Sequence, residues 1–216
     1  MSGFHTVQQG EYLSKIAADY GFRDYQAIWN HAENAELKSQ RQTPNVLFPG
    51  DRIFIPDRES KTEDRPTDKL HQFRALGEKL QLKIKIKDLN GLPVKDTPCG
   101  LAVENLTYSL TTDGDGIIQQ EIPRTAQTGR LTVKAPDVPI DTVLTLSIGG
   151  LDPLEEESGQ RQRLNNLGYN AGESDSQDPQ QFRSAVEEFQ CDFKVTPITG
   201  ICDATTQAKL KEAHGC

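Results

Sequence analysis

The sequence predicts a multi-domain α+β chain made of a βααβ module, a small β-sandwich and a C-terminal three-helix bundle. Three observations carry this prediction. Residues 5–56 alternate strand and helix signals, residues 80–148 repeat short period-two runs, and residues 151–216 place apolar side chains at helical spacing. The expected boundaries are 1–57 for the module, 58–70 for a charged linker, 71–150 for the β-domain and 151–216 for the helical domain.

The first module begins with a strand near residues 5–7 and a turn at Gly10. Apolar residues then recur at i, i+3, i+4 and i+7 through residues 13–20, which is the spacing of one buried stripe on a helix. Gly21 follows at the position expected of a helix C-cap. The first half of the module is therefore predicted to be strand, turn and helix.

A second helix is predicted after Asp24, whose carboxylate can cap it. Its apolar face consists of Ile28, Trp29 and Ala32. Because Trp29 lies on that face, we prefer core packing to a binding role for it. A Pro-Gly turn at 49–50 then leads into the β-branched and aromatic run at 53–55, which completes the module.

A spaced pattern of residues runs through this module. It consists of Thr6-Val7, Gly10, Leu13, Ile16-Ala17, Tyr20-Gly21, Leu47, Pro49-Gly50 and Ile53-x-Ile55-Pro56. With this pattern the stretch resembles a LysM module, a family that binds N-acetylglucosamine-containing glycans (peptidoglycan or chitin) in a shallow groove between two loops. Carried onto this chain, the resemblance implies a glycan-binding groove formed by Gly10, Glu11, Tyr12, Pro44, Asn45 and Val46.

Two positions depart from the family pattern. Tyr12 stands where the family usually has a small hydroxyl residue, so a helix-capping oxygen is lost. An exposed Tyr12 would stack on the apolar face of a sugar ring, whereas a packed Tyr12 would only cover the first turn of the helix, and the sequence favours neither. Residues 36–43 are also expected to lengthen the second loop.

The acidic balance of the chain limits its partners. There are 24 Lys and Arg residues against 32 Asp and Glu, and no apolar run reaches membrane-spanning length. We therefore expect neither nucleic acid nor an anionic membrane as a main partner. The first ten residues lack a basic segment followed by an apolar one, so no Sec signal is visible and cytoplasmic synthesis is expected.

The β-domain is predicted from alternation. Leu80, Leu82, Ile84 and Ile86 alternate with polar residues, which describes a strand with one buried face. Further short runs occur at 101–103, 107–111, 117–122, 131–133 and 143–148. Strands at this spacing favour a β-sandwich. A turn is indicated at Asn90-Gly91, and for Asp113-Gly-Asp-Gly we prefer a hairpin turn to a calcium site, because a distal bidentate Glu is missing.

The C-terminal region is predicted to hold three short helices. They begin near Ser158, near Gln181 and at Asp203. The pattern Leu164, Leu167-Gly168-Tyr169, Ala185-Val186, Phe189-Gln190, Thr199-Gly200, Asp203, Thr206 and Leu210 resembles the peptidoglycan-binding domain family often attached to cell-wall hydrolases. Three features depart from that family: Gln160-Arg161 replaces Leu-Gln, the loop at 173–182 lacks two glycines, and Phe182 replaces a Thr.

No catalytic centre, metal site or cofactor is predicted. The chain has no Gly-x-Ser-x-Gly or His-Glu-x-x-His motif. Cys99 would need His71 or His31 as a base, and a buried strand cysteine is the preferred interpretation. A zinc site formed by Cys191, Cys202 and His214-Gly-Cys216 fits no usual spacing, and a frayed C-terminus is preferred. The cysteines are expected to be reduced and mostly structural.

Two functions remain open. The first is a non-enzymatic peptidoglycan-binding protein with two terminal binding modules separated by a β-domain. The second is a structural or adaptor component of a secretion spike or tail that no longer binds glycan. The module order resembles proteins associated with type VI secretion and related contractile systems, which implies delivery to the periplasm or envelope and contact with spike or effector proteins. An enzyme is the least favoured class.

Overall fold

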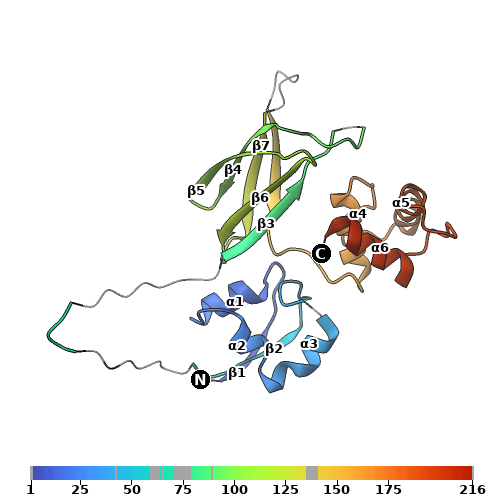
Figure 1. Ribbon diagram of the computed structural model, residues 1–216. Coiled ribbons are helices and arrows are strands. Elements are labelled where there is room, and N and C mark those ends of the chain that lie inside the picture. Colours follow the sequence, from blue (N-terminus) through green and yellow to red (C-terminus); the bar gives the residue numbers. More distant parts are fainter. Residues whose placement is uncertain are drawn as a thin grey trace. The chain divides into compact units, whose positions relative to one another are not determined.

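The computed structural model describes residues 2–41, 43–58, 64, 66–70, 79–88, 90–134 and 141–215. Figure 1 shows a mixed α+β architecture with several antiparallel sheets, as the sequence predicts. The chain divides into two compact units, one formed by residues 1–45 with 50–150 and the other by residues 46–49 with 151–216. Within the predicted linker at 58–70, residues 59–63 and 65 lie outside the described residues.

The N-terminal module pairs its first and last strands. Strand β1 (Gly3–Thr6) runs antiparallel to β2 (Arg52–Ile55), with Gly3 opposite Ile55 and Thr6 opposite Arg52. Helix α1 (Leu13–Asp19) buries Leu13, Ile16 and Ala17 of the predicted stripe. The prediction was wrong for Tyr20, the last residue of that stripe, which is exposed at the C-cap. Its N-cap, Tyr12, makes no side-chain capping bond, as expected from the loss of the hydroxyl residue.

The second helix of the module is interrupted. It consists of α2 (Gln26–Trp29), the 3₁₀ turn η1 (Ala32–Asn34) and α3 (Ala35–Arg41). Trp29 is buried as predicted, but the prediction that Ala32 lies on the apolar face was wrong, because Ala32 is exposed at the break. The expectation of a long loop at 36–43 was also wrong, because most of this segment is α3.

Asn34 holds the interrupted helix to the strands. Its buried side-chain amide donates hydrogen bonds to the carbonyls of Ile28 and Phe54, both at 2.8 Å, and accepts one from the Phe54 amide at 2.7 Å. The Asn34 side-chain amide therefore bonds both the carbonyl and the amide of Phe54 in β2, as the backbone of a neighbouring strand would. This bond set replaces the continuous helix that the sequence indicated.

The described residues of the β-domain form two antiparallel sheets. One pairs β3 (Lys79–Lys85) with β6 (Ile117–Pro123), which lie side by side in Figure 1. The other has the order β5–β4–β7–β8, from β4 (Pro98–Val103), β5 (Leu106–Thr111), β7 (Thr128–Val133) and β8 (Thr142–Ser147). Apolar residues of both sheets form one core cluster, including Leu101, Ile122 and Leu131.

The acidic turn at Asp113 is a corner between the two sheets, since β5 and β6 belong to different sheets. The Asp113 carboxylate accepts hydrogen bonds from the amides of Asp115 at 2.9 Å and Ile117 at 2.8 Å. These backbone bonds lower the pKa of Asp113. Because the carboxylate is used to close the loop, the turn interpretation explains it, although the turn joins two sheets and is not a hairpin.

The C-terminal unit contains a three-helix arrangement of α4 (Glu157–Asn166), α5 (Pro179–Asp192) and α6 (Ala204–His214). Its core consists of Leu164, Ala171, Ala185, Val186, Phe189 and Leu210. Asp178 and Asp203 cap α5 and α6 by accepting backbone amide hydrogen bonds. The predicted N-cap of α4, Ser158, lies inside the helix, and Glu156 occupies the cap position without a side-chain bond.

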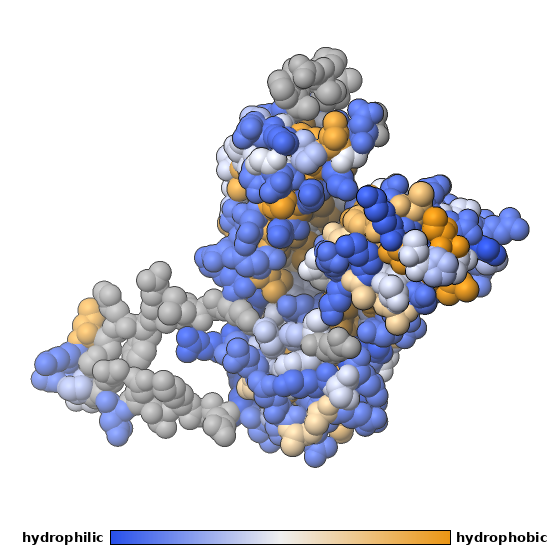
Figure 2. All heavy atoms as spheres, turned by 45° about the vertical axis from the view of Figure 1, so that its right-hand side comes forward, coloured by the Kyte–Doolittle hydropathy of each residue, from blue (hydrophilic) through white to orange (hydrophobic). Residues whose placement is uncertain are grey.

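The surface agrees with the polar composition. In Figure 2 hydrophilic residues cover most of the face shown, with smaller hydrophobic patches between them. Among the described residues, no helix combines the length and the apolarity that crossing a membrane requires.

Candidate functional site

The structure brings the two predicted groove loops of the N-terminal module together. The backbone amide of Leu13 donates a hydrogen bond to the Pro44 carbonyl at 3.2 Å. The Ser14 hydroxyl, which is buried, donates to the Asn45 side-chain oxygen at 3.3 Å. Asn45 is exposed, and Pro44 and Val46 are half-buried. The second loop is therefore fixed against the start of α1.

Glu11 is committed to shaping its own loop. Its carboxylate accepts a hydrogen bond from the Gln8 amide at 2.8 Å and lies 2.8 Å from the His5 ring nitrogen. Gly10, at φ +82°, makes the turn that permits this return. The loop is thus held in one conformation by interactions within the module, and Glu11 contributes to that conformation.

Tyr12 is 1% exposed, although it lies in the loop where an exposed aromatic was one of the two interpretations. Its hydroxyl donates to backbone carbonyls of the β-domain, at 2.6 Å from Ala126 and 3.0 Å from Arg124. Burial raises the pKa of Tyr12 to about 12, with Glu104 and Asp19 adding to the effect. In this conformation the ring face is not available to a sugar.

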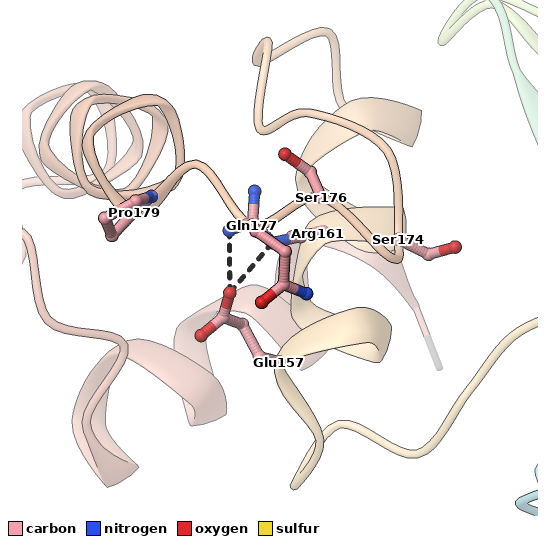
Figure 3. Close-up of a pocket in the computed structure, with 6 residues that line it drawn as sticks. All are labelled: Glu157, Arg161, Ser174, Ser176, Gln177 and Pro179. Carbon is pink, nitrogen blue, oxygen red and sulfur yellow. Dashed lines mark hydrogen bonds and ion pairs between the residues drawn. The ribbon is translucent and has the colours of Figure 1, made fainter.

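A second candidate site lies in the C-terminal unit, beside the loop between α4 and α5. A hollow of about 360 Å³ is lined by the six residues that Figure 3 draws: Glu157, Arg161, Ser174, Ser176, Gln177 and Pro179. A larger hollow of about 710 Å³ is lined by Asn165, Asn170, Gly172, Glu173, Asp175, Ser176 and Gln181. Ser176 borders both hollows. Their lining is rich in hydroxyl, amide and carboxylate groups, which suits hydrogen bonding to a polar ligand.

Arg161 builds the wall of this site. Its buried guanidinium donates to Glu157 at 2.9 and 2.7 Å, to the Ala171 carbonyl, and to the Asp178 carbonyl at 3.0 Å. The guanidinium also lies over the Phe182 ring, 4.7 Å from its centroid. One residue from each departure therefore meets at Arg161, which lies over Phe182 and donates to the Asp178 carbonyl in the loop that lacks the usual glycines.

Gly172 lets the same loop approach Arg161 closely. It has φ +81°, and a β-carbon there would lie 2.8 Å from the Gln181 side-chain oxygen and 3.1 Å from an Arg161 nitrogen. Neither Arg161 nor Gly172 was predicted to be a determinant of the site. Arg161 could have been recognised from the sequence, because an arginine at a core position of a helix needs acceptors for its N–H groups.

The three cysteines that the structure describes show no reactive arrangement. Cys99 is buried, its thiol lies 3.4 Å from the Thr97 carbonyl, and burial raises its pKa. Cys202 has its pKa raised to about 12 by burial and by Asp203. Within the described part of the chain, Cys99, Cys191 and Cys202 are free thiols and no cluster of three potential metal ligands occurs. His71 and Cys216 lie outside the described residues.

Comparison with known families agrees with both ends of the fold. Residues 5–56 match the LysM domain family, and residues 161–210 match the family described as "Putative peptidoglycan binding domain". No curated protein and no solved structure matches the chain. The chain thus combines two domains of binding families, one before the β-domain in the sequence and one after it.

Proposed function

We propose that this chain is a non-enzymatic peptidoglycan-binding protein that recognises N-acetylglucosamine-containing glycan. The observation that carries the proposal is the pair of family matches, at 5–56 and 161–210, on domains whose helices and strands agree with those families. Two weak sites on one chain strengthen each other when both engage the same polymer.

The proposed sites differ in what they offer. The C-terminal hollows present the exposed side chains of Ser174, Gln177 and Asn170, and these can bond hydroxyl and N-acetyl groups. The N-terminal site uses the backbone at Gly10 with Asn45, flanked by Pro44 and Val46. We assign initial wall binding to the C-terminal site, because its polar side chains are exposed, whereas Tyr12 of the N-terminal groove loop is buried.

Sedimentation with purified sacculi tests this function. The full chain is expected to pellet with sacculi and to be displaced by soluble muropeptides. Replacing Ser174 and Gln177 by Ala in one variant is expected to reduce the bound fraction at least fivefold. Lys211→Ala, on the exposed face of α6, is the matched control and should bind normally. If the full chain remains in the supernatant at saturating sacculi, the proposed function is wrong.

We further propose that the protein acts with a type VI or other contractile secretion apparatus, which would deliver it to the periplasm or envelope. The support is the resemblance in module order, with a β-domain between two wall-binding folds. Its partners would be spike or effector proteins. Export that is unchanged after deletion of the sheath gene would contradict this role, whereas dependence on the sheath would support it.

The alternative is an adaptor of the same assembly that no longer binds glycan. The burial of Tyr12 against the β-domain favours this alternative for the N-terminal module, because a residue of the predicted groove is used for packing. A chain that assembles with spike proteins but does not pellet with sacculi would identify the adaptor.

A further inference from the structure

Tyr12 packs against Arg124, Ala126 and Gly149 of the β-domain, and we call this surface the socket. The module and the β-domain belong to one compact unit, formed by residues 1–45 and 50–150. The Tyr12 hydroxyl donates to two backbone carbonyls that lie 112 and 114 residues further along the chain. Ala126, whose carbonyl accepts the shorter bond, is itself fully buried. Since both acceptors are backbone atoms, the socket is set by the fold of the β-domain.

Gly149 gives the Tyr12 ring its space. This glycine has φ +79°, and a β-carbon there would overlap the Tyr12 ring. A side chain at position 149 is therefore incompatible with the seated ring. The backbone carbonyls of Arg124 and Ala126 accept from the Tyr12 hydroxyl, and Gly149 lies against the side of its ring. The site therefore matches both the polar hydroxyl and the flat apolar ring of a tyrosine.

Arg124 makes a second, reciprocal contact. Its guanidinium donates to the Phe22 carbonyl at 2.8 Å and to the Arg23 carbonyl at 2.7 Å, in the segment after α1. The carbonyl of the same Arg124 accepts from Tyr12. Residues 124–126 thus bind the module at both ends of α1, which fixes the helix against the β-domain.

We propose that Tyr12 is an intramolecular latch that withholds the first groove loop of the N-terminal module from glycan until the β-domain is released. This inference rests on the proposed function, because it concerns when one of the two glycan sites is available. With Tyr12 seated, the loop at 10–12 is held to the β-domain and its one aromatic ring is buried. Release breaks the Tyr12 hydroxyl bonds and the Arg124 bonds and exposes the Tyr12 ring, while the Glu11 bonds keep the turn at residues 8–11 in place.

The test compares the full-length wild type with Tyr12→Ser, which removes the latch and restores a small hydroxyl at the helix N-cap. Tyr25→Ser, at the half-buried N-cap of α2, is the matched control. The probe is the soluble tetramer of N-acetylglucosamine, and the readout is the amide NMR shift of Gly10 and Asn45. Hydrogen exchange of residues 124–127 reports whether the latch has opened.

In the wild type and in Tyr25→Ser, the tetramer is expected to leave Gly10 and Asn45 unshifted. In Tyr12→Ser, exchange at 124–127 should rise at least tenfold and both amides should shift saturably. The proposal is overturned if the wild-type module binds as tightly as Tyr12→Ser, if exchange is unchanged, or if the opened variant still binds nothing at the module. If Tyr12→Ser fails to fold, Gly149→Ala, whose side chain is incompatible with the seated ring, takes its place with the same expected direction.

Failure of the latch and failure of the proposed function are separate results. Sacculus sedimentation of the wild type measures wall binding by the whole chain, whichever domain provides it. The tetramer titration measures only the change at Gly10 and Asn45 between wild type and variant. A wild type that pellets, with an opened variant whose module stays unshifted, refutes the latch and leaves wall binding standing.

Discussion

At the scale of single residues, two positions that depart from the family patterns, Tyr12 and Arg161, have buried side chains with several hydrogen bonds. Arg161 is 1% exposed and bonds two backbone carbonyls and a carboxylate from inside the helical unit. Tyr12 is equally buried and bonds two carbonyls. Each substitution brought hydrogen-bond donors into a buried place, and in each case the backbone supplies the acceptors.

Arg161→Gln is expected to destabilise the C-terminal unit by about 3 kcal/mol, because it leaves buried carbonyls without donors and removes the contact with Phe182. Thermal unfolding followed by circular dichroism measures the loss. The control is Arg183→Gln, whose side chain is exposed and pairs with Glu187 one turn away, and about 0.5 kcal/mol or less is expected there. Equal effects of the two variants would refute the anchoring role of Arg161.

At the scale of elements, the N-terminal module shows how one side chain determines a helix break. The chain leaves α2 after Trp29 and resumes a helix at Ala35, and Asn34 lies between them. By bonding the carbonyls of Ile28 and Phe54, Asn34 gives the interruption its hydrogen bonds. The break also turns α3 into a separate element that leads to the second groove loop.

Asn34→Ala is expected to cost about 3 kcal/mol, since three hydrogen bonds are lost and buried backbone groups are left unpaired. Urea unfolding followed by the fluorescence of Trp29, the single tryptophan of the chain, reports on this module. Asn30→Ala is the control, because Asn30 is exposed and bonds only the Lys38 amine among the contacts described. A cost below 1 kcal/mol for Asn34→Ala would contradict the role given to its amide group.

Periodicity predicted most elements, and it failed where a distant segment decides the outcome. The alternation at Leu80, Leu82 and Ile84 identified β3 because burial on one face leaves a period of two. Residues 35–41 are good helix formers, so α3 was predictable from propensity. The burial of Tyr12 was not predictable, because its partners lie more than a hundred residues away in the sequence. The motif Asp113-Gly-Asp-Gly indicated a turn, but nothing in the motif specifies that β5 and β6 belong to different sheets.

At the scale of the whole molecule, the pKa values predict sensitivity to acid. Burial, with Arg163 nearby, lowers the pKa of His214 from its ordinary value of 6.5 to about 4. Hydrogen bonds from Thr206 lower the pKa of Asp203. For both groups the unfolded chain binds protons that the folded chain does not, so stability falls as the pH falls.

The largest part of this loss is expected between pH 6.5 and 4, where the unfolded His214 is protonated and the folded one is neutral. We expect about 2 kcal/mol of stability to be lost across this interval. Unfolding midpoints should be measured at several pH values. Between pH 6.5 and 4, the midpoint should depend less on pH in His214→Gln than in the wild type. An unchanged slope in that variant would assign the acid sensitivity to other groups.

The pairing of β3 with β6 has a consequence for how the chain acquires its structure during synthesis. Lys79 pairs with Pro123 and Lys85 with Ile117, so β3 leaves the ribosome well before its partner strand exists. The N-terminal module, whose own strands close at Ile55, is complete earlier. A nascent chain stalled between these two points would display Tyr12 to the solvent, with no socket yet made to receive it.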